Sequence, residues 1–261
     1  MKLSRIMLFF WLALPFCVIL RFLQLYFTIE IETGFFDVNY AGYGKGLLIL
    51  IFTVCLAAAF FAYLAHSRPE HPPKINLPLC ISSILLCGVL LYEVIFENPP
   101  ASVAFWQAAL LKITGFSTAL YFLLFGISYK ARFKLPPLFC VFPVVYLISR
   151  IICDFTTISK LAFISDNIIL MGAYSVTLLF MLNFAKLYNN VDSEKNFKKL
   201  LSCGVASIIL SFTGSIPNIV FNLASGRYLH TPLLAAFSLL CFGIFILSFI
   251  LSHFSKQNLN D

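Results

Sequence analysis

Eight long apolar runs, joined by short polar connections, constrain this chain of 261 residues more than any other feature. Each run has the roughly 20 residues that an α-helix needs to cross the hydrocarbon core of a bilayer. With 61% hydrophobic and 11% charged residues, the chain has too few polar side chains to cover a soluble globule. The sequence therefore predicts an all-α, polytopic membrane protein with about eight transmembrane helices, at residues 6–28, 47–65, 77–96, 103–129, 137–157, 166–186, 200–223 and 231–252.

The positive charges between these runs predict which side of the membrane each connection faces. When the spans alternate in direction, 12 of the 18 Lys and Arg residues fall on the side of the two termini. Lys45, Lys160 and Arg227 fall on the other side, and three more lie within apolar runs. Because cytosolic loops carry an excess of Lys and Arg, we expect both termini to be cytosolic. The 12 residues are Lys2, Arg5, Arg68, Lys74, Lys130, Arg132, Lys134, Lys186, Lys195, Lys198, Lys199 and Lys256.

The spans use most of the chain, so we expect a single integral membrane domain, 1–261, with no soluble nucleotide-binding or kinase domain. The net charge of +7 is spread over every cytosolic loop and forms no single stripe, which argues against nucleic acid as a partner. We interpret the first run as an uncleaved helix because no small-x-small cleavage site follows it. Short loops and a Lys-rich cytosolic side favour a multi-pass protein of a bacterial plasma membrane. The first and fifth spans share a pattern in which Pro is followed after five or six residues by Arg, then after four residues by an aromatic residue, and two positions later by Thr. This recurrence suggests a four-helix duplication, 1–132 and 133–261.

The sequence contains no motif that identifies a catalytic, cofactor or metal site. It has no His-Glu-x-x-His, no Gly-x-Ser-x-Gly and no Walker-type phosphate loop. The eight cysteines all lie within apolar runs without Cys-x-x-Cys spacing, so we interpret them as small packing residues. We therefore expect no cofactor, no metal, no catalytic residue and no enzymatic activity.

Ionisable side chains inside the spans are the candidate site residues, because charges are costly there and usually face the interior of a bundle. Arg21, Glu93, Lys112, Arg150 and Asp154 all fall about 20–26 Å from the cytosolic ends of their helices at about 1.5 Å per residue. In a core of about 30 Å this is the outer half, which predicts a polar chamber facing outward. The amides Gln24, Gln107 and Asn218 fall at a similar depth, and we include Asn218 among the ligand-binding candidates.

The spacing of these charges predicts how they pair. Arg150 and Asp154 are four residues apart on one helix face, and we expect them to pack toward the first helix. Glu93 and Lys112, on consecutive helices, are expected to face each other. Arg21 is then left without a carboxylate and would suit a carboxylate or phosphate ligand. The alternative is a structural one, in which Arg21 shares Asp154 with Arg150 and the charges hold helices together.

Three classes of function fit these patterns. The first is a solute-binding or transport subunit of the permease type for a small anionic ligand, either a solute or a lipid headgroup, with a membrane or ATPase partner. The second is a non-catalytic sensor or accessory subunit whose buried charges are structural. The third, an intramembrane enzyme using Glu93 or Asp154 as acid or base, ranks last because no nucleophile or metal site accompanies these residues.

Overall fold

The structure is a computed structural model that describes residues 3–30, 35–64, 76–96, 104–131, 135–158, 165–189, 193–225 and 232–257. In these ranges it is helical apart from turns and one β-bridge between Ile29 and Phe36. The elements are α1 (Leu3–Phe27), α2 (Ala41–Tyr63), α3 (Leu77–Phe96), α4 (Phe105–Ala131), the 3-10 helix η1 (Pro137–Val141), α5 (Phe142–Ile158), α6 (Ser165–Tyr188), α7 (Ser193–Ser225) and α8 (Leu233–Gln257).

Every predicted span coincides with a helix, which confirms the all-α class. Within the described ranges, 8 helices are long and apolar enough to cross a membrane. The largest differences are at two helix starts, where α2 and α7 begin at Ala41 and Ser193, several residues before the predicted spans. Both added segments contain lysines, which hydropathy assigns to loops although they continue the helices.

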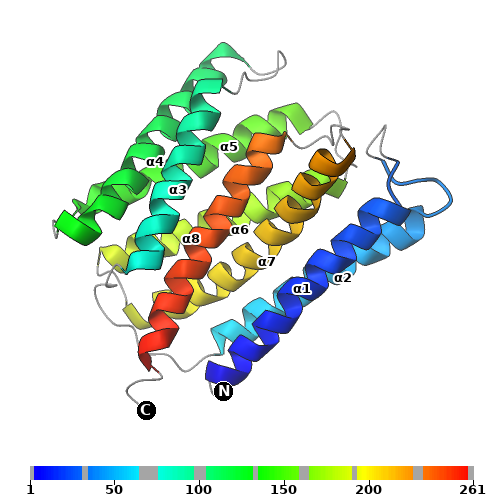
Figure 1. Ribbon diagram of the computed structural model, residues 1–261, viewed down its shortest axis with the longest axis horizontal. Coiled ribbons are helices and arrows are strands. Elements are labelled where there is room, and N and C mark those ends of the chain that lie inside the picture. Colours follow the sequence, from blue (N-terminus) through cyan, green and yellow to red (C-terminus); the bar gives the residue numbers. More distant parts are fainter. Residues whose placement is uncertain are drawn as a thin grey trace.

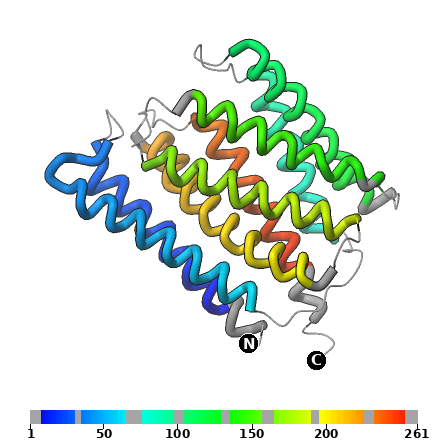
Figure 2. Tube along the Cα trace, turned by 180° about the vertical axis from the view of Figure 1, so that it is seen from behind, coloured from blue at the N-terminus to red at the C-terminus, as the bar shows by residue number. Residues whose placement is uncertain are grey.

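Six of the helices form a ring, and the other two form a hairpin attached to it. Packing runs from α3 to α4, α5, α6, α7 and α8, and α8 closes the ring by packing on α3. The α1–α2 hairpin packs on α7, outside the ring (Figure 1). From behind, α5 and α6 lie across the near side of the molecule, and the hairpin again lies at one edge (Figure 2). Consecutive helices are antiparallel, so α1 begins and α8 ends at the same end of the bundle.

The outer surface of the bundle is apolar in the middle of the helices. Large aliphatic side chains such as Ile19, Leu56, Ile81 and Ile113 are exposed there. A soluble protein rarely leaves a continuous apolar surface of this kind uncovered. This surface and the length of the helices are those of a multi-pass membrane protein in contact with lipid.

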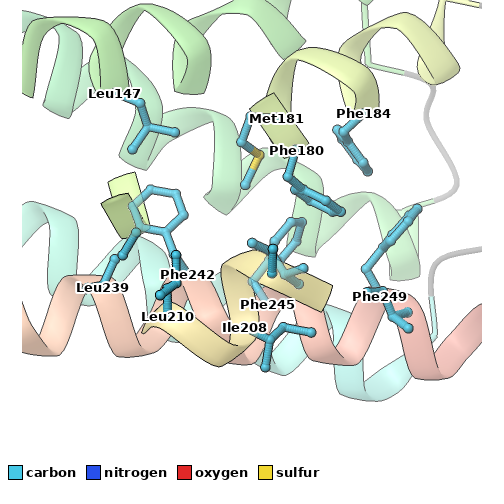
Figure 3. Packing of buried hydrophobic residues seen from close by; sticks show 14 of the residues in the cluster. Leu147, Phe180, Met181, Phe184, Ile208, Leu210, Leu239, Phe242, Phe245 and Phe249 are labelled. Atoms are coloured by element: carbon cyan, nitrogen blue, oxygen red, sulfur yellow. The ribbon is translucent and has the colours of Figure 1, made fainter. Parts of the chain in front are cut away.

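Aromatic packing fills the interior of the ring. Phe180 and Phe184 of α6 pack edge-on against Phe245 and Phe249 of α8, as in the pair Phe184–Phe249 with centroids 5.2 Å apart and planes at 78°. Figure 3 shows these rings together with aliphatic side chains of α5 and α7. Edge-to-face pairs are the preferred geometry of such rings. Where these aromatic side chains lie, the interior of the ring is therefore filled by packed side chains.

Prolines at three places in the apolar runs have two different positions in the helices. Pro15 and Pro217 lie inside α1 and α7. Pro143 is instead the second residue of α5, directly after η1. A proline in the first turn removes an N–H that has no helical partner, so it starts a helix without breaking one. The apolar run begins before α5 because it includes η1.

Several of the Lys and Arg residues on which the topology prediction depends lie outside the described residues, including Lys2, Arg68, Arg132, Lys160 and Arg227. The cytosolic location of the termini stays a prediction. The division into one membrane domain with an internal duplication also stays a prediction.

Candidate functional site

Arg21 lies on a polar stripe along the buried face of α1. Residues 17, 21, 24 and 28 follow helical spacing on one side of the helix, and Cys17, Arg21, Gln24 and Thr28 are all buried. The side chain of Arg21 is 0% exposed. Because α1 is in the hairpin, this face places the guanidinium at the seam between the hairpin and the ring.

The guanidinium of Arg21 meets a carboxylate on α6, which corrects the expectation that it has none. Nη2 donates to Asp166 Oδ1 in an ion pair. Nη1 donates to Gln24 Oε1 and to Ser165 Oγ, the latter at 3.2 Å. Nε is buried, and no hydrogen-bond acceptor among the described residues reaches it. We call Arg21, Gln24, Ser165 and Asp166 the Arg21 group.

Gln24 is held in place by the second helix of the hairpin. Its Nε2 donates to the backbone oxygen of Gly44 at 2.7 Å. A Cβ on Gly44 would lie 2.3 Å from the Phe36 ring and 2.9 Å from Thr28 Oγ1, so glycine is needed for this close approach. The segment before α2 folds back here, with Asp37 N donating to Thr28 O at 2.9 Å. The Gln24 side of the Arg21 group is therefore fixed by backbone.

The sequence alone does not identify Asp166 as a site residue, because Asp166 is the first residue of the predicted span 166–186 and so falls at its boundary. It is only 3% exposed. The signal was present in the run Ser165-Asp166-Asn167, since acidic and small polar residues favour the N-terminal turn of a helix. Arg21 reaches this turn although α1 packs mainly on α2 and α7.

Arg150 gathers a second set of side chains inside the ring. Its Nε donates to Asp154 Oδ2 at 3.1 Å, which confirms the pair four residues apart. Its Nη1 forms an ion pair with Glu93 of α3, and its guanidinium carbon lies 5.8 Å from the centre of the Tyr174 ring of α6. Tyr146 OH donates to Glu93 Oε1 at 3.4 Å. We call Glu93, Tyr146, Arg150, Asp154 and Tyr174 the Arg150 group.

These contacts correct two predicted pairings. Arg150 contacts Glu93 of α3 and Tyr174 of α6, and not α1. Glu93 pairs with Arg150 instead of Lys112, and no carboxylate of the described ranges pairs with Lys112.

The register of α3 and α4 explains the second correction. A Cβ on Gly115 would lie 2.6 Å from Val94, which puts Glu93 level with the residue after Gly115. Lys112 is then four residues, about 6 Å, nearer than Glu93 to the end at which α3 connects to α4. Counting depth from apolar run ends could not resolve this offset.

Asn218 is buried on α7 and lies level with Asp166. Thr177 and Ser207 share a hydrogen bond of 2.6 Å between α6 and α7, and a Cβ on Gly214 would lie 3.1 Å from Ile169. In this antiparallel register, Asn218 comes opposite Ser165 and Asp166. Among the candidate residues predicted from the sequence, Asn218 therefore lies at the same depth as the Arg21 group.

The candidate residues thus form two groups at different depths. Asp166 and Tyr174, one from each group, are eight residues apart on α6, a rise of about 12 Å. Arg21 belongs to one group, and Arg150, Glu93 and Asp154 belong to the other. Lys112 is half-buried and lies outside both. The chamber predicted from the sequence therefore divides into a site at the seam and a site within the ring.

The contacts in the two groups are ion pairs and hydrogen bonds between side chains. Among the described residues no three His, Cys, Asp or Glu side chains come together as ligands of a metal would. All eight cysteines are free thiols. Some donate across helices, as Cys55 does to Ala206 O at 3.6 Å.

Comparison with known proteins gives no relative for this arrangement. No protein-family model, no curated protein and no solved structure matches the chain.

Proposed function

We propose that this chain is a solute-binding or transport subunit of the permease type in a plasma membrane, and that it binds a small anionic ligand at Arg21. The observation that supports this proposal is the buried Nε of Arg21, a charged donor without an acceptor in the described residues. A donor of this kind in a low-dielectric site favours an added oxyanion. The proposed role is non-catalytic.

The surroundings of Arg21 favour the same chemistry. The helix α6 begins at Ser165, and the first N–H groups of a helix, which have no acceptor within the helix, attract anions. Ser165 and Gln24 add neutral polar groups, and Asn218 lies at the same depth. The location also fits, because ligand sites commonly lie between packed units. The Arg150 group would then serve as the support that holds the ring in shape.

The test is stabilisation by anions. Thermal unfolding of the purified protein in an uncharged detergent is followed with sodium acetate, succinate, phosphate or sulfate, at constant ionic strength balanced with sodium chloride. We expect the melting temperature of wild type to rise with one of these anions and that of Arg21→Gln to show no rise. Arg21→Lys should bind more weakly, because an ammonium lacks the planar pair of donors.

A matched control removes a different positive charge. Lys112→Gln changes net charge by the same amount outside the Arg21 group, and it should keep the response of wild type to the anion. If wild type gains no stability from any of the anions, or Arg21→Gln gains as much as wild type, the proposal fails.

Orientation in the membrane belongs to the same proposal, with both termini cytosolic and the Arg21 group near the outer surface. Single cysteines at Asn39 and Ser193, in a variant lacking the native cysteines, should label from opposite sides. We expect a membrane-impermeant maleimide to reach Asn39→Cys in intact cells and Ser193→Cys only after lysis. Labelling of both positions in intact cells would contradict this orientation.

A second candidate is a non-catalytic sensor or accessory subunit of a membrane complex. It is favoured by the observation that Arg21 and Arg150 each have a carboxylate partner, so neither charge requires a ligand. Uptake by reconstituted vesicles would support the first function. Absence of uptake together with a partner subunit that co-purifies in stoichiometric amount would support the second.

A further inference from the structure

Asp166 occupies the position in which an anionic ligand would meet Arg21. Its carboxylate belongs to the N-terminal turn of α6 and accepts from the guanidinium. A guanidinium and a helix N-terminus each favour an oxyanion. We propose that Asp166 is a built-in competitor, and that a small carboxylate ligand binds by displacing Asp166 from Arg21. This inference rests on the proposed function, and it concerns how that site is regulated.

The unused donor of Arg21 gives the ligand an advantage over Asp166. Asp166 takes one hydrogen bond, from Nη2, through Oδ1. Nε, the neighbouring donor on the same edge, is buried and has no acceptor in the described part of the chain. A carboxylate that spans Nε and Nη2 makes the parallel, bidentate pair of hydrogen bonds that arginine forms best. An incoming carboxylate would therefore gain one charge-assisted hydrogen bond that Asp166 does not make.

The two sides of the Arg21 group differ in how firmly they are held. Gln24 lies within α1 and is bonded to the Gly44 backbone, so its side stays in place. Asp166 is in the first turn of α6, where backbone N–H groups have no acceptor within the helix. Reorientation at residue 166 thus breaks fewer helical hydrogen bonds than a change within α1. Asp166 is the partner that we expect to move.

Displacement of Asp166 would also remove one of the side-chain contacts between the hairpin and the ring. Arg21 links α1 to α6 through its ion pair with Asp166 and its hydrogen bond to Ser165, and the two helices otherwise pack on other neighbours. Exchange of Asp166 for a ligand would release that ion pair while α1 and α2 stay packed on α7. Ligand binding at this site would in this way be coupled to the seam between hairpin and ring.

The experiment compares wild type with Asp166→Asn, which keeps the size of the side chain and removes the competing charge. The dissociation constant for acetate is measured by titration calorimetry or thermal shift in an uncharged detergent at constant ionic strength. We expect Asp166→Asn to melt at a lower temperature without acetate and to bind acetate at least about tenfold more tightly than wild type. Tenfold is a modest gain for removing a charge that competes within the site.

A matched control makes the same kind of change in the other group. Glu93→Gln also converts a buried, Arg-paired carboxylate to an amide, so it should lower stability while the affinity for acetate stays that of wild type. The double variant Arg21→Gln with Asp166→Asn should bind no acetate. If Asp166→Asn does not fold alone, Asp166→Ser and purification in acetate provide the second variant, because an added carboxylate should restore the missing charge.

The outcomes separate this inference from the proposed function. If wild type binds acetate and Asp166→Asn binds it equally or more weakly, Asp166 is no competitor, although the anion site stands. If neither binds any of the anions, both ideas are overturned. Failure of both Asp166 variants to fold in acetate also overturns the competitor, since the ligand should replace Asp166.

A further arm distinguishes a solute from a lipid headgroup. Wild type and Asp166→Asn are placed in nanodiscs of phosphatidylcholine alone or with phosphatidylglycerol. A stronger stabilisation of Asp166→Asn than of wild type by acetate supports a soluble ligand, and the same contrast with phosphatidylglycerol supports a headgroup phosphate. Equal responses of the two proteins in every condition would contradict the proposal.

Discussion

Arg21 and Arg150 are both buried arginines with carboxylate partners, yet they are built into the molecule in different ways. Arg150 lies inside the ring, where it reaches α3 through Glu93 and α6 through Tyr174. Tyr174 OH in turn donates to Ala235 O of α8 at 3.4 Å. Arg21 lies at the seam and links the hairpin to the first turn of α6. Arg150 therefore links helices within the ring, and Arg21 links the hairpin to the ring.

The difference teaches that burial and ion pairing alone do not identify a binding residue. The Arg150 group surrounds its guanidinium with two carboxylates and an aromatic ring, which suits a structural support. The Arg21 group leaves Nε without an acceptor among the described residues and places it beside a helix start. Changes that disturb each group should therefore have different consequences for stability and for binding.

The largest effect is expected at Arg150. Arg150→Met leaves Glu93 and Asp154 in the ring without their shared cation, and a broken buried ion pair costs about 3–5 kcal/mol. Thermal or denaturant unfolding in detergent measures this loss. Unchanged stability would mean that water reaches both carboxylates, and the contrast between the two groups would disappear.

A smaller loss, of about 2–4 kcal/mol, is expected for Arg21→Gln. The remaining Asp166 is also a buried charge, but the N-terminus of α6 compensates by up to about 2 kcal/mol. If Arg21 had no carboxylate partner, Arg21→Gln would instead stabilise the protein without ligand, because it would remove an unpaired buried charge. The same unfolding measurement checks it, and a loss greater than that of Arg150→Met would contradict the ranking.

Gly44→Ala tests the fixed side of the Arg21 group. The added methyl would meet the Phe36 ring at 2.3 Å, and overpacking of this kind costs about 1–3 kcal/mol. Gly46→Ala in the same helix is the control, because a Cβ there has nothing within 4 Å. That change should be neutral or stabilising by up to about 1 kcal/mol. Equal melting temperatures for the two variants would show that Gly44 is not in close contact.

The smallest change is expected when the whole pair at the seam is removed. Replacing a buried ion pair by apolar side chains of similar volume is often neutral or stabilising. Arg21→Met with Asp166→Leu should therefore lie within about 1 kcal/mol of wild type in unfolding measurements, and should bind no anion. A loss as large as that of Arg21→Gln alone would indicate that the seam depends on the charges themselves.

The sequence predicted the fold well because hydropathy and helix length determine membrane spans almost alone. It also predicted that Arg21, Glu93 and Arg150 would be buried. The predicted pair of Arg150 with Asp154, a contact within one helix, forms as well, although Asp154 is partly exposed. It could not predict the partners of Arg21 and Glu93. Those depend on which helices are neighbours and on their register, as the one-turn offset of Lys112 from Glu93 illustrates. Asp166 was missed because a helix end was taken as the membrane surface.

The central claim is that Arg21, and not Arg150, exchanges its partner for an anion. The most direct measurement is the NMR signal of each arginine ¹⁵Nε–H group in protein labelled at its six arginines during a titration with acetate. Arg21→Lys and Arg150→Lys assign the two signals by their loss. We expect the chemical shift of the Arg21 signal to change with acetate concentration and to level off at saturation, because Nε gains an acceptor. The chemical shift of the Arg150 signal should not change. A shift of the Arg150 signal with an unchanged Arg21 signal, or no shift of either, would contradict the claim.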